Sequence, residues 1–224
     1  MSALVTTVGL SPTSLPELPY VGNRVVRVGI MGGTFDPIHN GHLVAAEVAM
    51  GEVGLDVVLF MPAGSPAFKQ DRHVSDPEDR YAMTLLATSD NPQFLTSRFE
   101  IARPGITYTA ETLGQLHEHY GDACHLYFIS GADAIASILT WKDADKLASL
   151  ATFVGATRPG SDLESAQRGI EESGLDFDVR YLEIPALSIS SSYLRERVSQ
   201  GKSVRYLTPD AVVGYIEKRG LYRS

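Results

Sequence analysis

Short apolar runs alternate with helix-like segments along most of the chain, and this alternation constrains the fold more than any other feature. The runs have the length and apolar character of buried strands, and they lie at 25–31, 56–61, 94–96, 125–129, 152–156 and 179–184. Strands that alternate with helices predict a mostly parallel sheet with helices on both faces. Ligands bind such a sheet outside the carboxyl ends of its strands, where the strand order reverses.

The segments between these runs have the periodicity and end signals of helices. Thr109, Ser190 and Thr208 are expected to be N-caps, and Pro209 and Asp210 suit the first turn of the last helix. Gly201 and Gly220 are expected to end the two C-terminal helices. The other expected helices are 41–50, 77–88, 109–119, 132–139 and 144–150, with a polar helix or loop at 160–174.

Residues 1–23 are expected to form an extended or disordered extension outside the fold. The stretch 11–19 contains three prolines and shows no hydrophobic period. A regulatory or partner-binding arm is the alternative. Residues 24–224 are then expected to form a single domain, with a helical C-terminal part from about residue 189.

Charge and cysteine content exclude several classes of protein. The formal net charge is −8, which argues against a general nucleic-acid binder. Cys124 is the only cysteine, so no intrachain disulfide can form and a cytoplasmic setting is expected. No apolar run is long enough to cross a membrane, and residues 1–10 lack the basic start of a signal peptide. Self-association is left open.

Residues 32–42, here called the histidine segment, combine a glycine turn, a helix start and two histidines. Gly32 and Gly33 permit close approach of the backbone to an anion, and the following helix offers unpaired N–H groups. His39 and His42 are three residues apart, so they share a helix face and can donate to one phosphate. By itself an H-x-x-H pair is more often structural, and a zinc pair would need a third ligand. The combination of features favours phosphate binding.

The histidine segment resembles the (S/T)-F-D-P-x-H-x-G-H signature of the nucleotidylyltransferase superfamily. Ile189–Arg195 resembles the superfamily's I-S-S-T-x-x-R motif, with Ser192 in place of threonine. A hydroxyl-rich helix start can hold phosphates, although alone it would be read as an ordinary capped helix. The resemblance implies an α/β, Rossmann-like doubly wound parallel sheet with C-terminal helices.

Four further stretches resemble bacterial nicotinate-mononucleotide adenylyltransferases. They match the family's E-x-x-R-x-G-x-S-Y-T-x-D-T-L, G-A-D…W, A-T-R-P-G and P-x-x-x-P-x-x-K patterns, at residues 97–113, 128–141, 156–160 and 62–69. Thr107 replaces serine and Glu111 replaces aspartate in the first of these. The likeness covers residues 25–222, and it is unconvincing only over 160–180.

The resemblance implies roles for individual residues. The catalytic set is His39, His42, Thr34 and Lys69. The ATP-binding set is Gly32, Gly33, Phe35, Gly41, Gly131, Asp133, Arg158, Ile189, Ser190, Ser191, Ser192 and Arg195. The set expected to bind nicotinate mononucleotide is Thr107, Tyr108, Thr109, Trp141 and Lys142.

Some of these side chains also have plainer interpretations. Trp141 can stack on a pyridine ring or complete a half-buried core. Asp133 can accept bonds from ribose hydroxyls or favour a helix start, and Lys69 can reach phosphates or remain a solvated loop residue.

The implied reaction is direct attack by the 5′-phosphate of nicotinate mononucleotide on the α-phosphorus of ATP. Mg²⁺ is expected to be held mainly by the phosphates, and no dedicated metal site is expected in the protein. The alternatives are a sister enzyme that uses pantetheine phosphate, a non-catalytic nucleotide sensor, and a flavoprotein. The stretch at Tyr108 and Trp141 argues against the first, and the histidine pair argues against the other two.

Overall fold

The computed structural model describes residues 15–66, 74–157, 164–185 and 187–223, and these residues contain one all-parallel sheet. Its strands are β1 (Val26–Gly33), β2 (Val57–Pro62), β3 (Phe94–Thr96), β4 (Cys124–Gly131), β5 (Thr152–Thr157) and β6 (Val179–Glu183). Their order is β3-β2-β1-β4-β5-β6, with parallel pairing throughout. The expected doubly wound sheet is confirmed, and its strand order reverses between β1 and β4.

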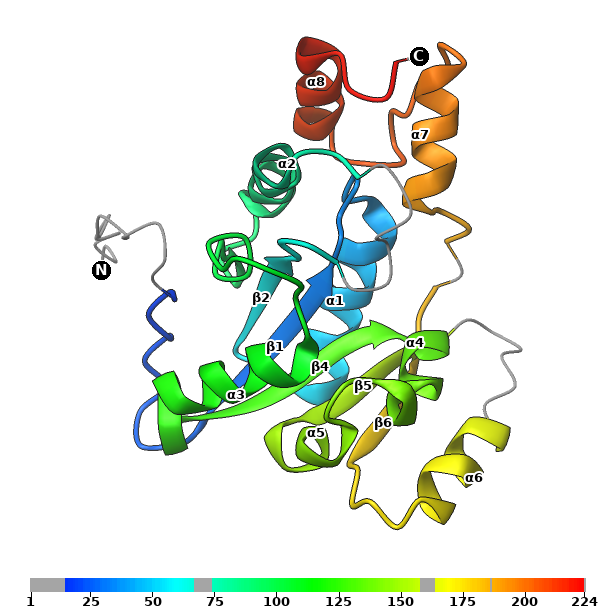
Figure 1. Ribbon diagram of the computed structural model, residues 1–224. Coiled ribbons are helices and arrows are strands. Elements are labelled where there is room, and N and C mark those ends of the chain that lie inside the picture. Colours follow the sequence, from blue (N-terminus) through cyan, green and yellow to red (C-terminus); the bar gives the residue numbers. More distant parts are fainter. Residues whose placement is uncertain (1–14, 67–73, 158–163, 186, 224) are drawn as a thin grey trace.

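Alternate residues of the strands face two separate cores. On one face, Val28 and Ile30 pack with the apolar side of α3 (Thr109–Tyr120), together with α4 (Ala132–Ala136), α5 (Ala144–Leu150) and α6 (Glu164–Glu172). On the other, Met31 and Phe60 pack with α1 (Asn40–Val53), α2 (Pro77–Thr88) and α8 (Asp210–Arg219). Figure 1 shows α1 and α3 on opposite sides of the strands. This burial on both faces explains why the strands are continuous apolar runs.

The helix and strand bounds follow the expected pattern with local differences. The bounds of α2, β3 and α5 agree with the expected ranges. The helix expected at 132–139 is instead α4 followed by a short 3₁₀ turn over Ile138–Thr140. Thr109 is the first residue of α3 rather than its N-cap, which is Tyr108. Gly220 ends α8 in the left-handed conformation, as expected.

Residues 15–23 pack on the fold, whereas the sequence analysis expected them to lie outside it. Leu15 is only 8% exposed and belongs to the same core as α3, with Leu18 and Val21 packed beside it. The hydroxyl of Tyr120 donates to the carbonyl of Pro16 at 2.8 Å. These apolar residues recur every three positions, a spacing that covers one side of an extended segment despite the prolines. Residues 1–14 lie outside the described part.

The C-terminal helices α7 (Ser191–Ser199) and α8 lie together at one end of the molecule (Figure 1). Helix α8 is joined to α2 by the Tyr215 hydroxyl, which donates to Asp79 at 2.8 Å, and by the Arg219 guanidinium. Within the described residues, no helix combines the length and apolar character needed to cross a membrane.

Candidate active site

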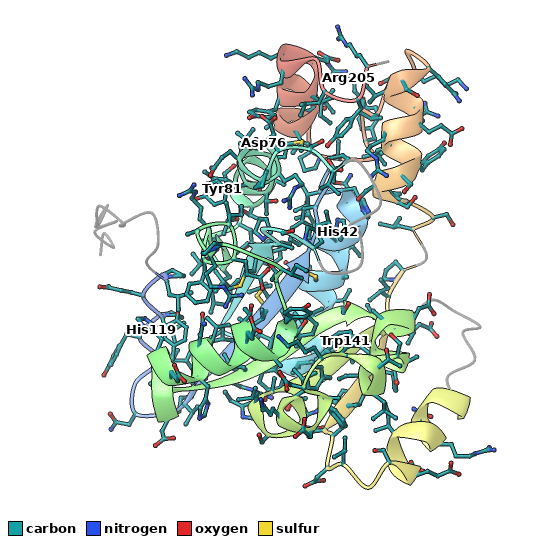
Figure 2. All side chains as sticks on the ribbon, in the orientation of Figure 1. His42, Asp76, Tyr81, His119, Trp141 and Arg205 are labelled. Atoms are coloured by element: carbon teal, nitrogen blue, oxygen red, sulfur yellow. The ribbon has the colours of Figure 1, made fainter. Side chains whose placement is uncertain are left out.

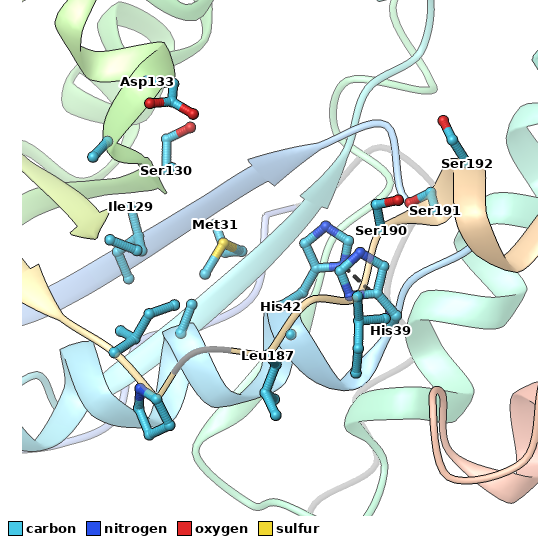
Figure 3. A pocket seen from close by; sticks show the side chains of 18 of the residues that line it. Met31, His39, His42, Ile129, Ser130, Asp133, Leu187, Ser190, Ser191 and Ser192 are labelled. Carbon is cyan, nitrogen blue, oxygen red and sulfur yellow. Dashed lines mark hydrogen bonds between the residues drawn. The ribbon is translucent and has the colours of Figure 1, made fainter. Parts of the chain in front are cut away.

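A pocket of about 440 Å³ opens at the carboxyl ends of β1, β4 and β5, where the strand order reverses. His39 and His42 lie beside Ser190–Ser192 in this pocket, and Ser130 and Asp133 lie some way from them (Figure 3). Apolar side chains line the rest, namely Met31, Ala45, Ile129, Ala132, Ala156, Ile184, Pro185, Leu187 and Ile189. The pocket therefore has one region rich in donors, one carboxylate, and an apolar wall between.

The two histidines form a stacked pair at the start of α1. Their ring centroids are 3.8 Å apart and their planes differ by 24°. The backbone N–H of His39 donates to Nδ1 of His42 at 3.2 Å, the bond drawn in Figure 3. Because Nδ1 of His42 accepts this bond, the neutral ring carries its proton on Nε2. The expected shared face of the two histidines is confirmed.

His39 is the more buried of the pair. Its side chain is 6% exposed, and burial lowers the pKa of the imidazole from 6.5 to about 4. Nδ1 of His39 is buried and has no hydrogen-bond partner among the described residues. A buried polar atom without a partner is costly, so this nitrogen suits a site that a ligand completes. His39 is neutral at neutral pH before any anion binds.

Gly41 explains why these rings can stack. A Cβ at position 41 would lie 3.0 Å from Nδ1 of His39, closer than most real contacts of a Cβ atom. The neighbouring aromatic ring of Phe35 meets His42 edge-on, with centroids 5.0 Å apart. The small residue at 41 and this aromatic ring together fix the orientation of the pair.

Phe35, Gly32 and Gly33, which were expected to bind ATP, make packing contacts behind the pocket. Phe35 is 2% exposed and packs in the core, so it supports His42 and does not line the pocket. A Cβ at Gly33 would lie 2.8 Å from the Phe35 ring, and one at Gly32 would lie 3.1 Å from Phe128. The glycines therefore make room for aromatic rings, and they too are absent from the pocket wall.

The start of α7 forms the hydroxyl-rich side of the pocket. Ser190 caps α7 as expected, and its hydroxyl accepts from the N–H of Tyr193 at 3.2 Å. The hydroxyl of Ser191 donates to the carbonyl of Pro37 at 2.8 Å. Arg195 donates to the carbonyl of Asp36 at 2.7 Å and to the Ser192 hydroxyl at 3.1 Å. Ile189–Arg195 and the histidine segment are thus in direct contact.

The residues expected to hold the second substrate do not line the pocket. The ammonium of Lys142 lies 4.0 Å from the ring centroid of Tyr108 and pairs with Glu111 at 2.7 Å. That pairing raises the pKa of Lys142. The Trp141 ring meets Phe128 edge-on, with ring centroids 5.8 Å apart.

Thr107 and Thr34, two other expected site residues, form hydrogen bonds through their backbone groups. The N–H of Thr107 donates to the carbonyl of Ser65 at 2.9 Å, which ties the start of α3 to the loop after β2. The carbonyl of Thr34 accepts from Arg80 at 2.8 Å. Arg80 is 1% exposed and also donates to the carbonyls of Gly64 and Ser75, so it joins both ends of that loop. The burial of Arg80 could not be predicted from the sequence, because helical periodicity gives no sign that a charged residue is buried.

Ten of the expected site residues line the pocket: His39, Gly41, His42, Gly131, Asp133, Ile189, Ser190, Ser191, Ser192 and Arg195. Lys69 and Arg158 lie outside the described residues. Apart from Ile189, the apolar wall was not predicted, although most of it lies at the ends of predicted strands, where a ligand site was expected.

Comparisons with known proteins point the same way as the geometry. The cytidylyltransferase-like family model matches residues 30–197. A probable nicotinate-nucleotide adenylyltransferase of Moorella thermoacetica is 51% identical over 202 residues, which cover 89% of this chain and 93% of the relative. A protein of the same description from Streptomyces coelicolor is 54% identical over 194 residues, covering 87% of this chain and all of the relative.

Among solved structures, the chain is similar to Plasmodium falciparum nicotinic acid mononucleotide adenylyltransferase complexed with NaAD. The TM-score is 0.70 at 20% identity, covering 88% of this chain and 97% of that chain. At this identity the likeness supports the fold alone.

Proposed function

The chain belongs to the nicotinate-nucleotide adenylyltransferase family within the cytidylyltransferase-like superfamily, and we propose that its pocket transfers AMP from ATP to nicotinate mononucleotide. The products are nicotinate adenine dinucleotide, an intermediate of NAD biosynthesis, and pyrophosphate. One observation carries the proposal: the stacked histidines lie beside the hydroxyl-rich start of α7 in a single pocket.

The reaction needs no protein nucleophile. An oxygen of the 5′-phosphate of nicotinate mononucleotide forms a bond to the α-phosphorus of ATP. The bond from that phosphorus to the oxygen bridging toward the β-phosphate breaks, and its electron pair leaves with pyrophosphate. The attacking oxygen is already an anion, so the protein acts by holding the two phosphates in line and by stabilising the charge on the α-phosphate.

The donors of the pocket suit this task. Nε2–H of His42 supplies a donor from a ring whose other nitrogen is already bonded. His39 adds a neutral ring at the pocket wall, where a bound phosphate would favour its protonated form. The β- and γ-phosphates are proposed to bind at the hydroxyls of Ser190 and Ser192 and the first two N–H groups of α7, since the Ser191 hydroxyl already donates to Pro37. Thr34 and Lys69 remain in the proposal as assisting groups.

The rest of the pocket suits the nucleoside of ATP. Met31, Ile129 and Leu187 offer an apolar surface to adenine, and Asp133 offers a carboxylate to the ribose hydroxyls. Arg158 stands in the proposal as a residue that flanks the nucleotide. ATP would then lie with its ribose near Asp133 and its phosphates near the histidines.

Nicotinate mononucleotide is proposed to bind near Tyr108 and Trp141. Phe128 touches both regions, since its ring contacts Trp141 and lies against Gly32 of the histidine segment. The first N–H groups of α3, at Thr109 and beyond, have no acceptor inside the helix and can receive a carboxylate. Thr107 and Lys142 complete the proposed set, and binding at Tyr108 requires Lys142 to leave the face of its ring.

Mg²⁺ fits this pocket as a partner of the phosphates. Within the described residues, no cluster of three or more His, Cys, Asp or Glu side chains is arranged to hold a metal by itself. The serine hydroxyls are oxygen groups of the kind that Mg²⁺ and its retained water prefer. When bound, the ion neutralises charge on the triphosphate. We propose that this reaction of charged metabolites takes place in the cytoplasm.

Pyrophosphate release tests the proposal. The protein is mixed with Mg²⁺ and ATP, together with nicotinate mononucleotide, nicotinamide mononucleotide or phosphopantetheine. We expect the fastest release with the first and formation of nicotinate adenine dinucleotide. No release with nicotinate mononucleotide would defeat the assignment, and faster release with phosphopantetheine would favour the sister enzyme.

A further inference from the structure

Three consecutive carbonyl groups just before His39 are held by side chains from the C-terminal part of the chain. The carbonyls of residues 36, 37 and 38 each accept one hydrogen bond. Their donors are Arg195 Nη1 at 2.7 Å, Ser191 Oγ at 2.8 Å and Thr208 Oγ1 at 2.8 Å. The turn that delivers His39 to the pocket is therefore fixed by residues more than 150 positions away in the sequence.

The carboxylate of Asp36 is held from the same side. It is 3% exposed, and it accepts from the hydroxyl of Tyr222 at 2.7 Å and from the N–H of Ser75 at 3.3 Å. Burial and the nearby carboxylate raise the pKa of Tyr222, so its hydroxyl remains a donor at neutral pH. The last described residues of the chain thus anchor the aspartate of the histidine segment.

Asn40, which follows His39, is also bonded to the C-terminal part of the chain. The N–H of Asn40 donates to the carbonyl of Leu207 at 2.9 Å, and its side-chain amide donates to the carbonyl of Tyr206 at 2.7 Å. Both acceptors belong to the connection between α7 and α8, where Figure 2 labels Arg205. His39 is therefore flanked on both sides by residues bonded to the C-terminal part.

Thr208 shows that this arrangement replaces an ordinary local one. Its position before Pro209 predicts an N-cap for α8, but the N-cap is Pro209 and no side chain caps that helix. The Thr208 hydroxyl, 1% exposed, instead donates to the carbonyl of Ile38, which is also fully buried. A capping bond typically stabilises a helix, so its loss here is offset by the bond to the histidine segment.

We propose that Thr208 and Tyr222 are positioning residues, which hold the turn at residues 36–38 so that His39 and His42 stack in the pocket. Neither residue lines the pocket, so neither would touch ATP there. Their effect on catalysis passes through the placement of the histidine rings, and displacement of catalytic groups by about 1 Å can cost about 10²-fold in rate. The kinetic part of this proposal rests on the proposed function.

The test compares variants that remove one hydroxyl each. Thr208→Val removes the donor to Ile38 and keeps the shape, whereas Thr208→Ser keeps the donor. Tyr222→Phe removes the donor to Asp36. Tyr215→Phe is the matched control. Tyr215 also lies in the C-terminal part and donates its hydroxyl to a carboxylate, but the acceptor is Asp79 on α2 and not the histidine segment. Melting temperature, kcat, both KM values and the imidazole NMR resonances of His39 and His42 are measured for each.

We expect Thr208→Val and Tyr222→Phe each to lower kcat about tenfold, with KM values within about twofold of wild type, because the other residues that line the pocket are unaltered. Thr208→Ser should restore kcat. Tyr215→Phe should leave kcat unchanged, and it should lower the melting temperature no more than Tyr222→Phe does. In the ligand-free protein, the histidine resonances should shift in the first two variants and not in the control.

The proposal is overturned if the histidine resonances and kcat of Thr208→Val and Tyr222→Phe match those of Tyr215→Phe. It is also overturned if Thr208→Ser behaves as Thr208→Val does. The NMR measurement needs no substrate, so a wild-type protein that released no pyrophosphate would defeat the proposed reaction while the placement of the histidines was still tested.

Discussion

His39 and His42 carry the same side chain but meet different surroundings. His42 receives a backbone N–H on Nδ1 and rests edge-on against Phe35, which fixes both its tautomer and its ring plane. His39 is buried, and the described residues offer its Nδ1 no partner. The orientation of the His42 ring is therefore fixed, whereas the pKa of His39 depends strongly on its surroundings.

Removal of the His42 side chain is expected to slow the reaction strongly. His42→Ala deletes the donor that we propose for the α-phosphate, and loss of one such donor typically costs about 10²–10³ in kcat. Steady-state pyrophosphate release measures the effect. His42→Gln, which retains a side-chain N–H, should lose less, and near-normal turnover of His42→Ala would contradict the proposed mechanism.

Protonation of His39 is expected to destabilise the ligand-free fold at low pH. Its pKa is about 4 when folded and about 6.5 when unfolded, so the unfolded chain binds more protons between these values. Its contribution to stability is therefore complete above pH 6.5 and is lost as the pH falls through 4.

Urea unfolding at pH 7 and pH 4.5 should show this loss, at about 2 kcal/mol. His39→Gln should remove that part of the pH dependence and should identify the His39 resonance in an NMR titration. A measured His39 pKa near 6.5 in the folded protein would contradict the prediction.

The element scale shows what the sequence could and could not predict. Apolar runs predicted each strand to within a few residues, because burial on both faces leaves little freedom in their composition. Caps were less predictable: Ser190 caps its helix, whereas Thr208 is recruited by a carbonyl 170 residues away. A local rule cannot foresee such a tertiary partner.

The same limit applies to the candidate site. The sequence motifs predicted that His39, His42 and Ser190–Ser192 share one site, and these residues line one pocket. The carboxyl ends of neighbouring strands and the motifs at helix starts converge there. It assigned Phe35 to ATP, although this ring is buried behind His42. It also missed Arg80, whose burial depends on three carbonyls that only the folded loop brings together.

The turn between β3 and α3 contains a buried carboxyl group with a testable pH dependence. Glu100 accepts from Thr112 of α3 at 2.7 Å, and burial raises its pKa from 4.5 to about 7. The folded protein therefore binds more protons here than the unfolded chain does. The contribution of Glu100 to stability is complete below pH 4.5 and is lost as the pH rises through 7.

Glu100→Gln, which mimics the protonated group, should raise stability at pH 8 by about 3 kcal/mol and change it little at pH 4. Denaturant unfolding at the two pH values measures this difference. Glu111→Gln is the matched control on α3, because Glu111 is paired with Lys142 at the surface, where such pairs contribute at most about 1 kcal/mol. Equal effects of Glu100→Gln at both pH values would contradict the shifted pKa.

At the scale of the whole molecule, the two ends of the parallel strands have different roles. The carboxyl ends of β1 and β4 border the pocket, and the C-terminal helices close over the histidine segment at that end. Residues 15–23 pack instead near the start of β1 and the last turn of α3, as the bond from Tyr120 to Pro16 shows. This segment should therefore affect stability without affecting catalysis.

Leu15→Ala tests that separation of roles. Leu15 is 8% exposed, and truncation of a buried leucine costs about 2 kcal/mol or more, so the melting temperature should fall by several degrees. Because the segment packs at the opposite ends of the strands from the pocket, kcat and both KM values should stay within about twofold of wild type at a temperature where the variant is folded. Tyr20→Ala is the control within the same segment, since Tyr20 is 92% exposed and its loss should change neither stability nor rate. A Leu15→Ala variant with unchanged melting temperature would show that the segment is not part of the core, and one with normal stability but slower turnover would link it to the site.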